Sequence, residues 1–266
     1  MTAIHVGCAG WLYEDWKRVF YPHNLESHKY LPYYSKIFNI VEINTTFYNL
    51  PTIEVVRNWN ERVSSEFRFI IKIWQEITHK PNNSDIDYLL SQFYNRMEPL
   101  KEKTYAYLFQ FPPWFNYKQK HLDQIINLVK LSPPDNIYVI ELRHNSWFKD
   151  EILNQITENE KVIIGTSYLN NILPYYKPNK SRYYIRLIGD RQLSVFNRVQ
   201  REKKEEFTEL IQIIKNFKKE SNIYEIFIIV NNHYTGFAPE TANFLKKELE
   251  LPFKSFTQQK KLSDYF

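Results

Sequence analysis

Short runs of β-branched and aromatic residues recur along the chain, and segments of mixed polarity separate them. Several runs are apolar throughout, as parallel strands that are covered on both faces should be. The segments between them carry apolar residues at helical spacing, which gives each one face to bury. This alternation predicts parallel strands joined by crossover helices. The predicted strands span residues 4–7, 40–43, 68–73, 105–110, 137–141, 162–166, 183–187 and 225–230, and the predicted helices span residues 53–62, 85–98, 122–131, 149–158, 202–219 and 239–248.

Eight strands in a chain of 266 residues favour an α/β fold, a single (β/α)8 barrel of the TIM type. The connection over residues 167–182 shows little helical periodicity, so we expect it to be irregular. The barrel domain is expected to span residues 1–251. A flexible, polar and basic tail is expected over residues 252–266.

The composition limits the class of protein. A hydrophobic fraction of 43% and a charged fraction of 24% are those of a globular chain and exclude disorder over most of its length. The single cysteine, Cys8, cannot form an internal disulfide. No apolar run is long enough to cross a bilayer and residues 1–10 lack the features of a signal peptide, so we expect a cytoplasmic protein with no membrane contact. The net charge of +5 permits a polyanionic partner but does not establish one.

Polar residues cluster where the predicted strands end, and in barrels of this type the chemistry is performed at those ends. The expected catalytic residues are Glu42, Lys72, Glu141 and His144. The expected substrate-binding residues are Trp11, Asn44, Tyr48, His79, Gln110, Arg143, Trp147, Arg186, Asn231 and Asn232.

Carboxylates and imidazoles among these residues could ligate a divalent metal, Mg²⁺, Mn²⁺ or Zn²⁺, which would polarise a phosphoryl oxygen and activate water. The expected ligands are Glu42, Glu141, His144 and His233. No organic cofactor is implied. Because no close ligand spacing such as His-Glu-x-x-His is present, the metal site depends on the barrel bringing these residues together.

Basic and aromatic residues at the same strand ends suggest an anionic substrate. The guanidinium and ammonium groups of Arg143, Arg186 and Lys72 suit phosphate oxygens. The neighbouring aromatics could stack on a base or sugar ring, and these are Trp11, Tyr48 and Trp147. A structural alternative stays open, in which Glu42 with Lys72, or Glu141 with one of the arginines, forms a buried ion pair that only fixes the loops.

Several longer motifs extend over almost the whole chain before the tail. They are Gly7-x-x-Gly10-Trp11, Phe20-Tyr21-Pro22, Val41-Glu42-Ile43-Asn44-x-Thr46-Phe47-Tyr48, Phe69-x-x-Lys72 with Thr78-His79, Gln110-x-Pro112-Pro113, Glu141-x-Arg143-His144-x-Ser146-Trp147 and Asn231-Asn232. In these motifs the chain resembles the YecE-like family, domain of unknown function 72. The resemblance implies a TIM-type barrel and supplies no reaction. One departure is Ile188, which stands where many relatives have His.

The C-terminal tail carries a second resemblance. Gln259, Leu262, Tyr265 and Phe266 have the spacing of the PIP-box peptide that binds PCNA-type sliding clamps. One helical turn would place the aliphatic and the two aromatic side chains on one face, to fit a hydrophobic groove. This resemblance implies a clamp partner, recruitment to DNA, and an archaeal or eukaryotic setting. The alternative is a frayed helix, or a tail whose aromatics fold back on the barrel.

Taken together, the strand ends, the basic charge and the tail favour a clamp-associated, metal-assisted nuclease or phosphodiesterase in DNA repair or replication, associated with the nucleoid through the clamp. Two alternatives stay open. One is a barrel enzyme acting on a sugar or sugar phosphate, and the other is a nucleic-acid-binding module without turnover that the clamp recruits.

Overall fold

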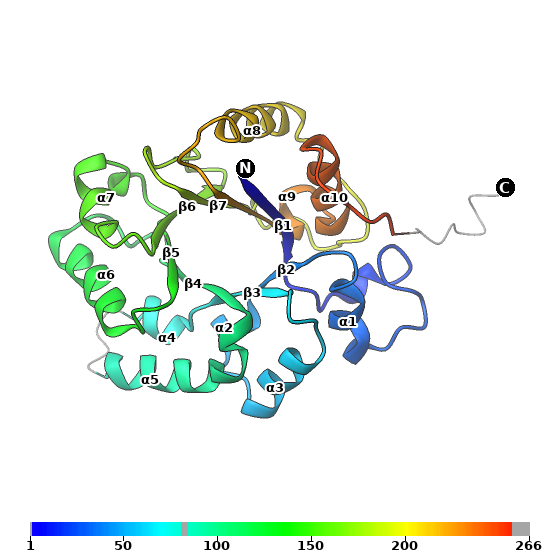
Figure 1. Cartoon of the computed structure of the whole chain (residues 1–266), viewed down its shortest axis with the longest axis horizontal. Helices are drawn as coiled ribbons and strands as arrows, with labels where there is room; N and C mark the ends of the chain where they lie inside the picture. Colours follow the sequence, from blue (N-terminus) through cyan, green and yellow to red (C-terminus); the bar gives the residue numbers. More distant parts are fainter. Residues whose placement is uncertain (1, 81–84, 257–266) are drawn as a thin grey trace.

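The computed structural model describes residues 2–80 and 85–256. Within them, eight parallel strands close into a barrel in sequence order, and β1 pairs with both β2 and β8 (Figure 1). The predicted (β/α)8 fold is therefore confirmed. The strands are β1 (Ala3–Ala9), β2 (Ile40–Ile43), β3 (Arg68–Lys72), β4 (Thr104–Gln110), β5 (Ile137–Glu141), β6 (Val162–Tyr168), β7 (Arg182–Leu187) and β8 (Glu225–Val230).

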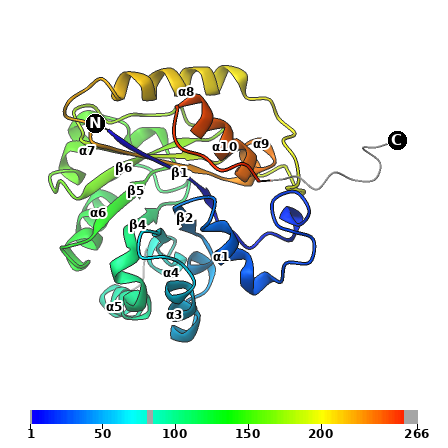
Figure 2. The same cartoon turned by 45° about the vertical axis from the view of Figure 1, so that its right-hand side comes forward.

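Helices surround the barrel in both views of the molecule (Figures 1 and 2). The longer ones are α3 (Ile53–Glu61), α5 (Ile86–Met97), α6 (Gln119–Leu131), α7 (Asp150–Ile156), α8 (Lys204–Phe217) and α10 (Ala238–Glu248). Shorter helical segments are α1 (Tyr30–Tyr34), α2 (Thr45–Tyr48), α4 (Gln75–Thr78), α9 (Asn232–Thr235), and the 3-10 turns η1 (Glu14–Trp16), η2 (Ser27–Lys29), η3 (Glu98–Lys103) and η4 (Asn145–Trp147). The described part of the chain contains no helix of the length and apolarity needed to span a membrane.

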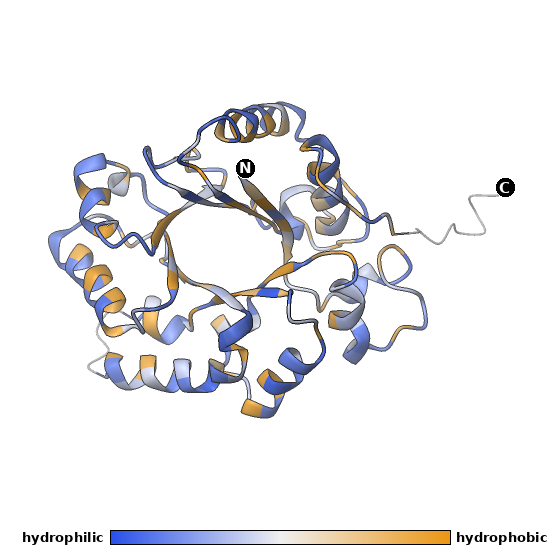
Figure 3. Ribbon diagram, viewed as in Figure 1, coloured by the Kyte–Doolittle hydropathy of each residue, from blue (hydrophilic) through white to orange (hydrophobic). Residues whose placement is uncertain are grey.

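The outer helices are amphipathic, and in Figure 3 they carry both apolar and polar colours. In α6, for example, Leu122, Ile125 and Leu128 are buried, while Lys120 and Gln119 are exposed. Residues three or four apart share a helix face, so this spacing buries one side of the helix against the strands. The same pattern predicted the six longer helices, each of which begins and ends within three residues of its predicted bounds.

The interior of the barrel is packed with side chains that alternate with the outward-facing positions of each strand. This inner layer contains Ile40, Ile70, Leu108, Val139 and Tyr184, all buried. Because the side-chain period of a strand is two, the next interior position lies two residues further along each strand. Those next positions form the candidate site.

Gly7 illustrates how closely the strands approach. A Cβ atom at this position would overlap the backbone carbonyl of Ile40 on β2. Only glycine has no Cβ, so the close approach of β1 to β2 depends on it.

Candidate functional site

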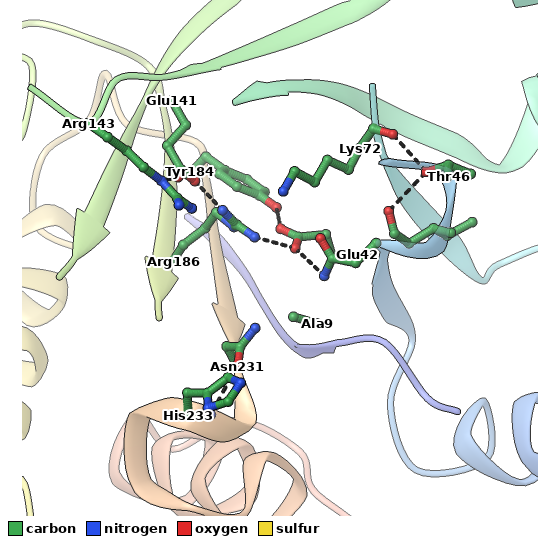
Figure 4. Close-up of polar contacts among 12 residues, drawn as sticks. Ala9, Glu42, Thr46, Lys72, Glu141, Arg143, Tyr184, Arg186, Asn231 and His233 are labelled. Carbon is green, nitrogen blue, oxygen red and sulfur yellow. Dashed lines mark hydrogen bonds and ion pairs between the residues drawn. The ribbon is translucent and has the colours of Figure 1, made fainter. Parts of the chain in front are cut away.

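Four ionisable side chains occupy one end of the barrel interior. Two residues beyond Ile40, Ile70, Val139 and Tyr184 lie Glu42, Lys72, Glu141 and Arg186, and all four are buried. Parallel strands end at the same mouth of a TIM-type barrel, so residues far apart in sequence meet there. We call Glu42, Lys72, Glu141 and Arg186 the mouth cluster (Figure 4).

Arg186 lies at the centre of the mouth cluster and joins the two carboxylates. Its Nη2 is 2.6 Å from Oε1 of Glu42, and its Nη1 donates to Oε2 of Glu141 (Figure 4). Both carboxylates are fully buried. An isolated buried charge is strongly disfavoured, so each charge here depends on its partners. The guanidinium fork thereby ties the ends of β2, β5 and β7 together.

Neighbouring side chains complete the hydrogen bonding of the two carboxylates. Glu42 accepts a hydrogen bond from the hydroxyl of Tyr184 at 2.6 Å and another from Nδ2 of Asn44 at 2.9 Å. Glu141 accepts one from Nε of Arg143 at 2.6 Å. Charge-assisted bonds of this length are strong, and they hold the donors in fixed positions. The carboxylates therefore act as anchors for the basic side chains at the mouth.

The mutual electrostatics keep Glu141 and Arg186 ionised. Burial alone raises the pKa of Glu141, but Arg143 and Arg186 outweigh it and lower that pKa to about 2. Burial likewise works to lower the pKa of Arg186, and the two carboxylates outweigh it and raise that pKa above its ordinary value. These charges are consequently present throughout the physiological pH range.

Lys72 differs from the other members of the mouth cluster. Among the described residues, no ion pair or side-chain hydrogen bond engages its ammonium group, whose Nζ lies 3.7 Å from the centroid of the Phe47 ring. The residue is only 5% exposed. Burial, followed by the charge of Arg186 and then that of Arg143, lowers the pKa of Lys72 to about 7, against the opposing effect of the carboxylates. Near neutral pH, a large fraction of this amine is therefore uncharged.

His79 follows α4 and lies beside Lys72. Its Nδ1 is 2.8 Å from Oγ1 of Thr78, and its ring meets that of Phe47 edge-on with centroids 4.9 Å apart. Burial, then the charges of Lys72 and Arg143, lower the pKa of His79 to about 4. The imidazole is thus neutral at pH 7.

A cleft of about 840 Å³ opens at this mouth of the barrel. Phe47 and Arg143 line it, and the same two residues contact Lys72 and Glu141 of the mouth cluster. The cleft therefore lies directly against the cluster. Tyr48, His79, Gln110, His144 and Arg191 line it further.

The structure brings together most of the residues predicted at the strand ends. The four members of the mouth cluster are in one place, Asn44 and Arg143 bind its carboxylates, and Tyr48, His79, Gln110 and His144 line the adjoining cleft. The alternative in which these carboxylates form buried ion pairs is also met in part. Glu141 is a buried ion-pair partner of both arginines, whereas Glu42 pairs with Arg186 and not with Lys72.

Two predicted aromatic walls are corrected. Trp11 is 4% exposed and packs edge-on against Trp59 with centroids 5.6 Å apart. Trp147 is 0% exposed, and its Nε1 donates to the carbonyl of Phe115 at 2.6 Å. Both rings are buried, and burial of such large aromatic surfaces stabilises the fold. The exposed aromatic rings at the cleft are Tyr48, at 57%, and Trp114, at 52%.

Two other predicted ligand contacts are also corrected. Arg186 is 4% exposed, and both of its terminal nitrogens bind carboxylates, so it positions other groups and does not reach the cleft. The buried Asn232 accepts hydrogen bonds from Nε1 of Trp16 at 3.2 Å and from the backbone of Ala238 at 3.0 Å, which makes it a link between loops. Asn231 caps α9 and lies apart from the Glu42–Arg186 pair (Figure 4), and its contact with a substrate stays a prediction.

The residues expected to ligate a metal do not fit that role. In residues 2–80 and 85–256, no three or more His, Cys, Asp or Glu side chains are grouped so as to hold a metal ion. Arginine, tyrosine and asparagine donors occupy the oxygens of Glu42 and Glu141, Nδ1 of His144 is 2.8 Å from Oγ of Ser146, and His233 lies apart in Figure 4. The proposed set of Glu42, Glu141, His144 and His233 is thus corrected, because cationic partners already neutralise the carboxylates.

Sequence reasoning missed Tyr184 and Arg191. Tyr184 precedes Arg186 by two residues, so the strand period places both in the interior, and that signal was available. Arg191 lies in the loop after β7, where no periodicity exists to follow. The clamp-binding peptide predicted at Gln259, Leu262, Tyr265 and Phe266 lies outside the described residues.

Comparison with known proteins agrees with the motifs at the barrel mouth. The family described as "Protein of unknown function DUF72" matches residues 5–264. The chain belongs to this family. Its relatives include the UPF0759 protein YecE of Escherichia coli strain K12, 32% identical over 145 residues, which are 54% of this chain and 50% of YecE. The UPF0759 protein YunF of Bacillus subtilis is 30% identical over 158 residues, 57% of this chain and 55% of YunF. The chain therefore spans about half the length of the curated family members it matches.

Solved structures of the family share the barrel. A DUF72 family protein from Thermotoga maritima is 25% identical, with a TM-score of 0.76 over 93% of this chain and 99% of that one. One from Enterococcus faecalis is 22% identical, with a TM-score of 0.75 over 95% of this chain and 99% of that one. The fold is thus common to the family across these distant sequences.

Proposed function

We propose that this protein is a DNA-processing enzyme that binds a phosphate-bearing strand in the cleft at the barrel mouth and cleaves it there. The observation that carries the proposal is the charge of the cleft lining. Arg143 and Arg191 line it, and the one carboxylate that lines it among the described residues, Asp190, is already paired with Arg201 at 2.6 Å. An anionic ligand is therefore favoured at this surface.

In this proposal each residue at the barrel mouth has a separate role. Arg143, held by Glu141, offers terminal N–H groups to a phosphate, and Arg191 approaches from the loop after β7. Tyr48 offers an exposed ring against which a base or sugar can stack. Lys72 lies deeper, where it would meet the part of the ligand that follows the phosphate. Preorganised cations of this kind stabilise negative charge as it develops on a leaving phosphate.

The tail supports the DNA assignment from the sequence. Gln259, Leu262, Tyr265 and Phe266 have the spacing of a PCNA-binding peptide, and tethering to a clamp would raise the local concentration of DNA. The test uses a synthetic peptide of residues 254–266 titrated into an archaeal-type clamp by calorimetry. Binding with a micromolar Kd or tighter is expected, and a Leu262→Ala, Phe266→Ala double variant is expected to abolish it. Absence of heat and of competition would refute the tether.

The binding assay tests the cleft directly. Fluorescence anisotropy of the full-length protein with single-stranded, duplex and abasic-site DNA is measured over a range of salt concentrations. Removing one phosphate contact by Arg191→Gln should reduce the salt slope of log K by about 1. Arg57→Gln is the matched control, because Arg57 is an exposed residue of α3 outside the cleft. Equal slopes for the two variants and the wild type would rule out DNA binding at the mouth.

Cleavage is measured on the same DNAs by denaturing gel, in EDTA and separately with magnesium, manganese or zinc. Activity that is lost in Arg143→Gln and kept in Arg57→Gln is expected. If the protein binds DNA in the cleft but the DNA stays intact under all of these conditions, the protein is a DNA-binding module and the proposed cleavage activity is refuted.

A second candidate is an enzyme for a free sugar phosphate, which the size of the cleft favours. Its volume of about 840 Å³ lies within the range of small-molecule sites. The same two arginines would hold the phosphate, and the aromatic ring of Tyr48 would contact the sugar. The anisotropy assay above tests this candidate by adding ribose 5-phosphate to the complex with labelled DNA. Displacement of the DNA would show that both ligands bind at the same site, and no displacement would show that they do not.

A further inference from the structure

We propose that the amine of Lys72 is a nucleophile that forms an imine with the carbonyl carbon of a phosphate-bearing sugar in its open-chain aldehyde form. This inference rests on the proposed binding of a phosphate-bearing ligand in the cleft and adds the chemistry of the reacting group. Two sources share this chemistry, an abasic site in DNA and a free sugar phosphate.

The position of Lys72 carries the inference. The side chain extends from the end of β3 toward the Glu42–Arg186 pair (Figure 4), yet among the described residues no carboxylate forms an ion pair with it. Its contact is the face of Phe47, a residue that also lines the cleft. A lysine that serves only to balance charge would pair with one of the two nearby carboxylates, but Arg186 engages both of them.

The charged groups around Lys72 act in opposing directions. Arg186 on β7 and Arg143 after β5 disfavour its ammonium form, and Glu141 and Glu42 favour it. The neutral imidazole of His79 adds no charge at pH 7. Burial is the largest effect, and with these neighbours it lowers the pKa of Lys72 to about 7. An amine with this pKa is about half free base at pH 7, whereas a lysine in water is free base to less than roughly one part in a thousand.

The reaction needs no oxidant, reductant or metal. The nitrogen lone pair of Lys72 attacks the aldehyde carbon, and the C=O π electrons move to the oxygen. That oxygen takes up the proton from the nitrogen, which gives a carbinolamine, and loss of water then gives the imine. At an abasic site, the imine acidifies the adjacent C2′–H bond. The proton passes to solvent in the open cleft, the C3′–O bond breaks, and the 3′-phosphate leaves with the bonding electrons. Water then hydrolyses the imine, which frees Lys72 and an unsaturated aldehyde end.

The cleft provides a place for the leaving phosphate and the sugar. Arg143 lines the cleft and is anchored to Glu141, so its guanidinium stands at a fixed position beside the cluster that contains Lys72. Phosphate charge that builds up as the C3′–O bond breaks would meet this cation. Strand scission by this route is expected in EDTA, which agrees with a mouth cluster whose carboxylates are not free to ligate a metal.

Reductive trapping tests the inference. The full-length protein is incubated with sodium cyanoborohydride and either a duplex containing one abasic site or ribose 5-phosphate, and the adduct is measured by intact mass and located by peptide mapping. Lys72→Arg and Lys72→Met remove the amine. Lys246→Arg is the matched control, because Lys246 also lies over an aromatic ring, with Nζ 5.6 Å from the centroid of Phe38, and it belongs to α10 outside the cleft.

An adduct that maps to Lys72, falls at least ~10-fold in Lys72→Arg and is unchanged in Lys246→Arg supports the inference. Trapping of the abasic duplex alone assigns the DNA source, and trapping of ribose 5-phosphate alone assigns the free sugar. No adduct with either probe, or an adduct spread over many lysines, overturns it. If trapping fails while Arg191→Gln still lowers the salt slope of DNA binding, the proposed function stands without the imine. If trapping succeeds only with ribose 5-phosphate and the salt slope is unchanged, the imine stands and the DNA assignment falls.

Discussion

Replacing Lys72 by methionine is expected to stabilise the protein near neutral pH, although the residue lies at the candidate site. Methionine retains the apolar stem and removes the ammonium group of a residue that is only 5% exposed, a group with no carboxylate partner among the described residues. The pKa of Lys72 is lowered from 10.5 to about 7, which corresponds to about 5 kcal/mol at ~1.4 kcal/mol per pH unit. Loss of the contact with Phe47 offsets ~1–2 kcal/mol of this. The net gain at pH 6.5 is thus about 3–4 kcal/mol, or roughly 6–16 °C in Tm.

The pH dependence supplies the stricter test. Between pH 7 and 10.5 the unfolded chain holds a proton on Lys72 that the folded chain has released. The stability of the wild type therefore rises with pH through this window, by up to ~1.4 kcal/mol per unit relative to Lys72→Met, and is level below it. The advantage of the variant should be largest below pH 7 and mostly gone by about pH 9–10.

Urea unfolding followed by tryptophan fluorescence at pH 6.5, 8 and 9.5 measures these differences. Lys246→Met is the control, because that side chain is only partly buried on α10 and should give a smaller change. A Lys72→Met variant that is less stable than the wild type at pH 6.5, or a difference that does not change with pH, would refute the assignment of an unpaired buried ammonium.

Three further outcomes are expected. Arg186→Met leaves two buried carboxylates without their shared partner and should lower the free energy of unfolding by about 3–5 kcal/mol in urea titration, whereas Tyr184→Phe removes one hydrogen bond to Glu42 and should lower it by only ~1–3 kcal/mol. The pKa of Glu141 is about 2, so the stability that its ionised form contributes is complete above pH 4.5 and is lost as the pH falls through 2. Between pH 5 and 2, the Tm of Glu141→Gln should therefore fall less steeply than the Tm of the wild type. Parallel curves of Tm against pH would contradict this. Gly7→Ala should prevent accumulation of folded protein or lower its Tm strongly by calorimetry, since the new methyl group would meet the backbone of β2; an unchanged Tm would show that the strands can separate without loss.

Much of the candidate site could be predicted because it follows from strand ends. Glu42, Lys72, Glu141 and Arg186 each sit at or near the end of an apolar run, and closure of a parallel barrel brings such ends to one mouth. The pairing among them could not be predicted. Arg186 binds Glu42 across 144 residues of sequence, and nothing local to either residue indicates which carboxylate it takes. The predicted metal ligands failed for this reason, because the two arginines occupy both carboxylates in the folded barrel.

The sequence by itself determined the order and type of the elements, because hydrophobic periodicity is local and reports directly on which face of a strand or helix is buried. It also determined which polar residues stand at the strand ends. Tertiary structure alone decided that Trp147 is buried and Tyr48 exposed, that Glu141 holds two arginines, and that Lys72 has an aromatic neighbour and no carboxylate partner within the described chain. These properties arise from distances between separate strands and loops, and those distances exist only once the barrel has closed.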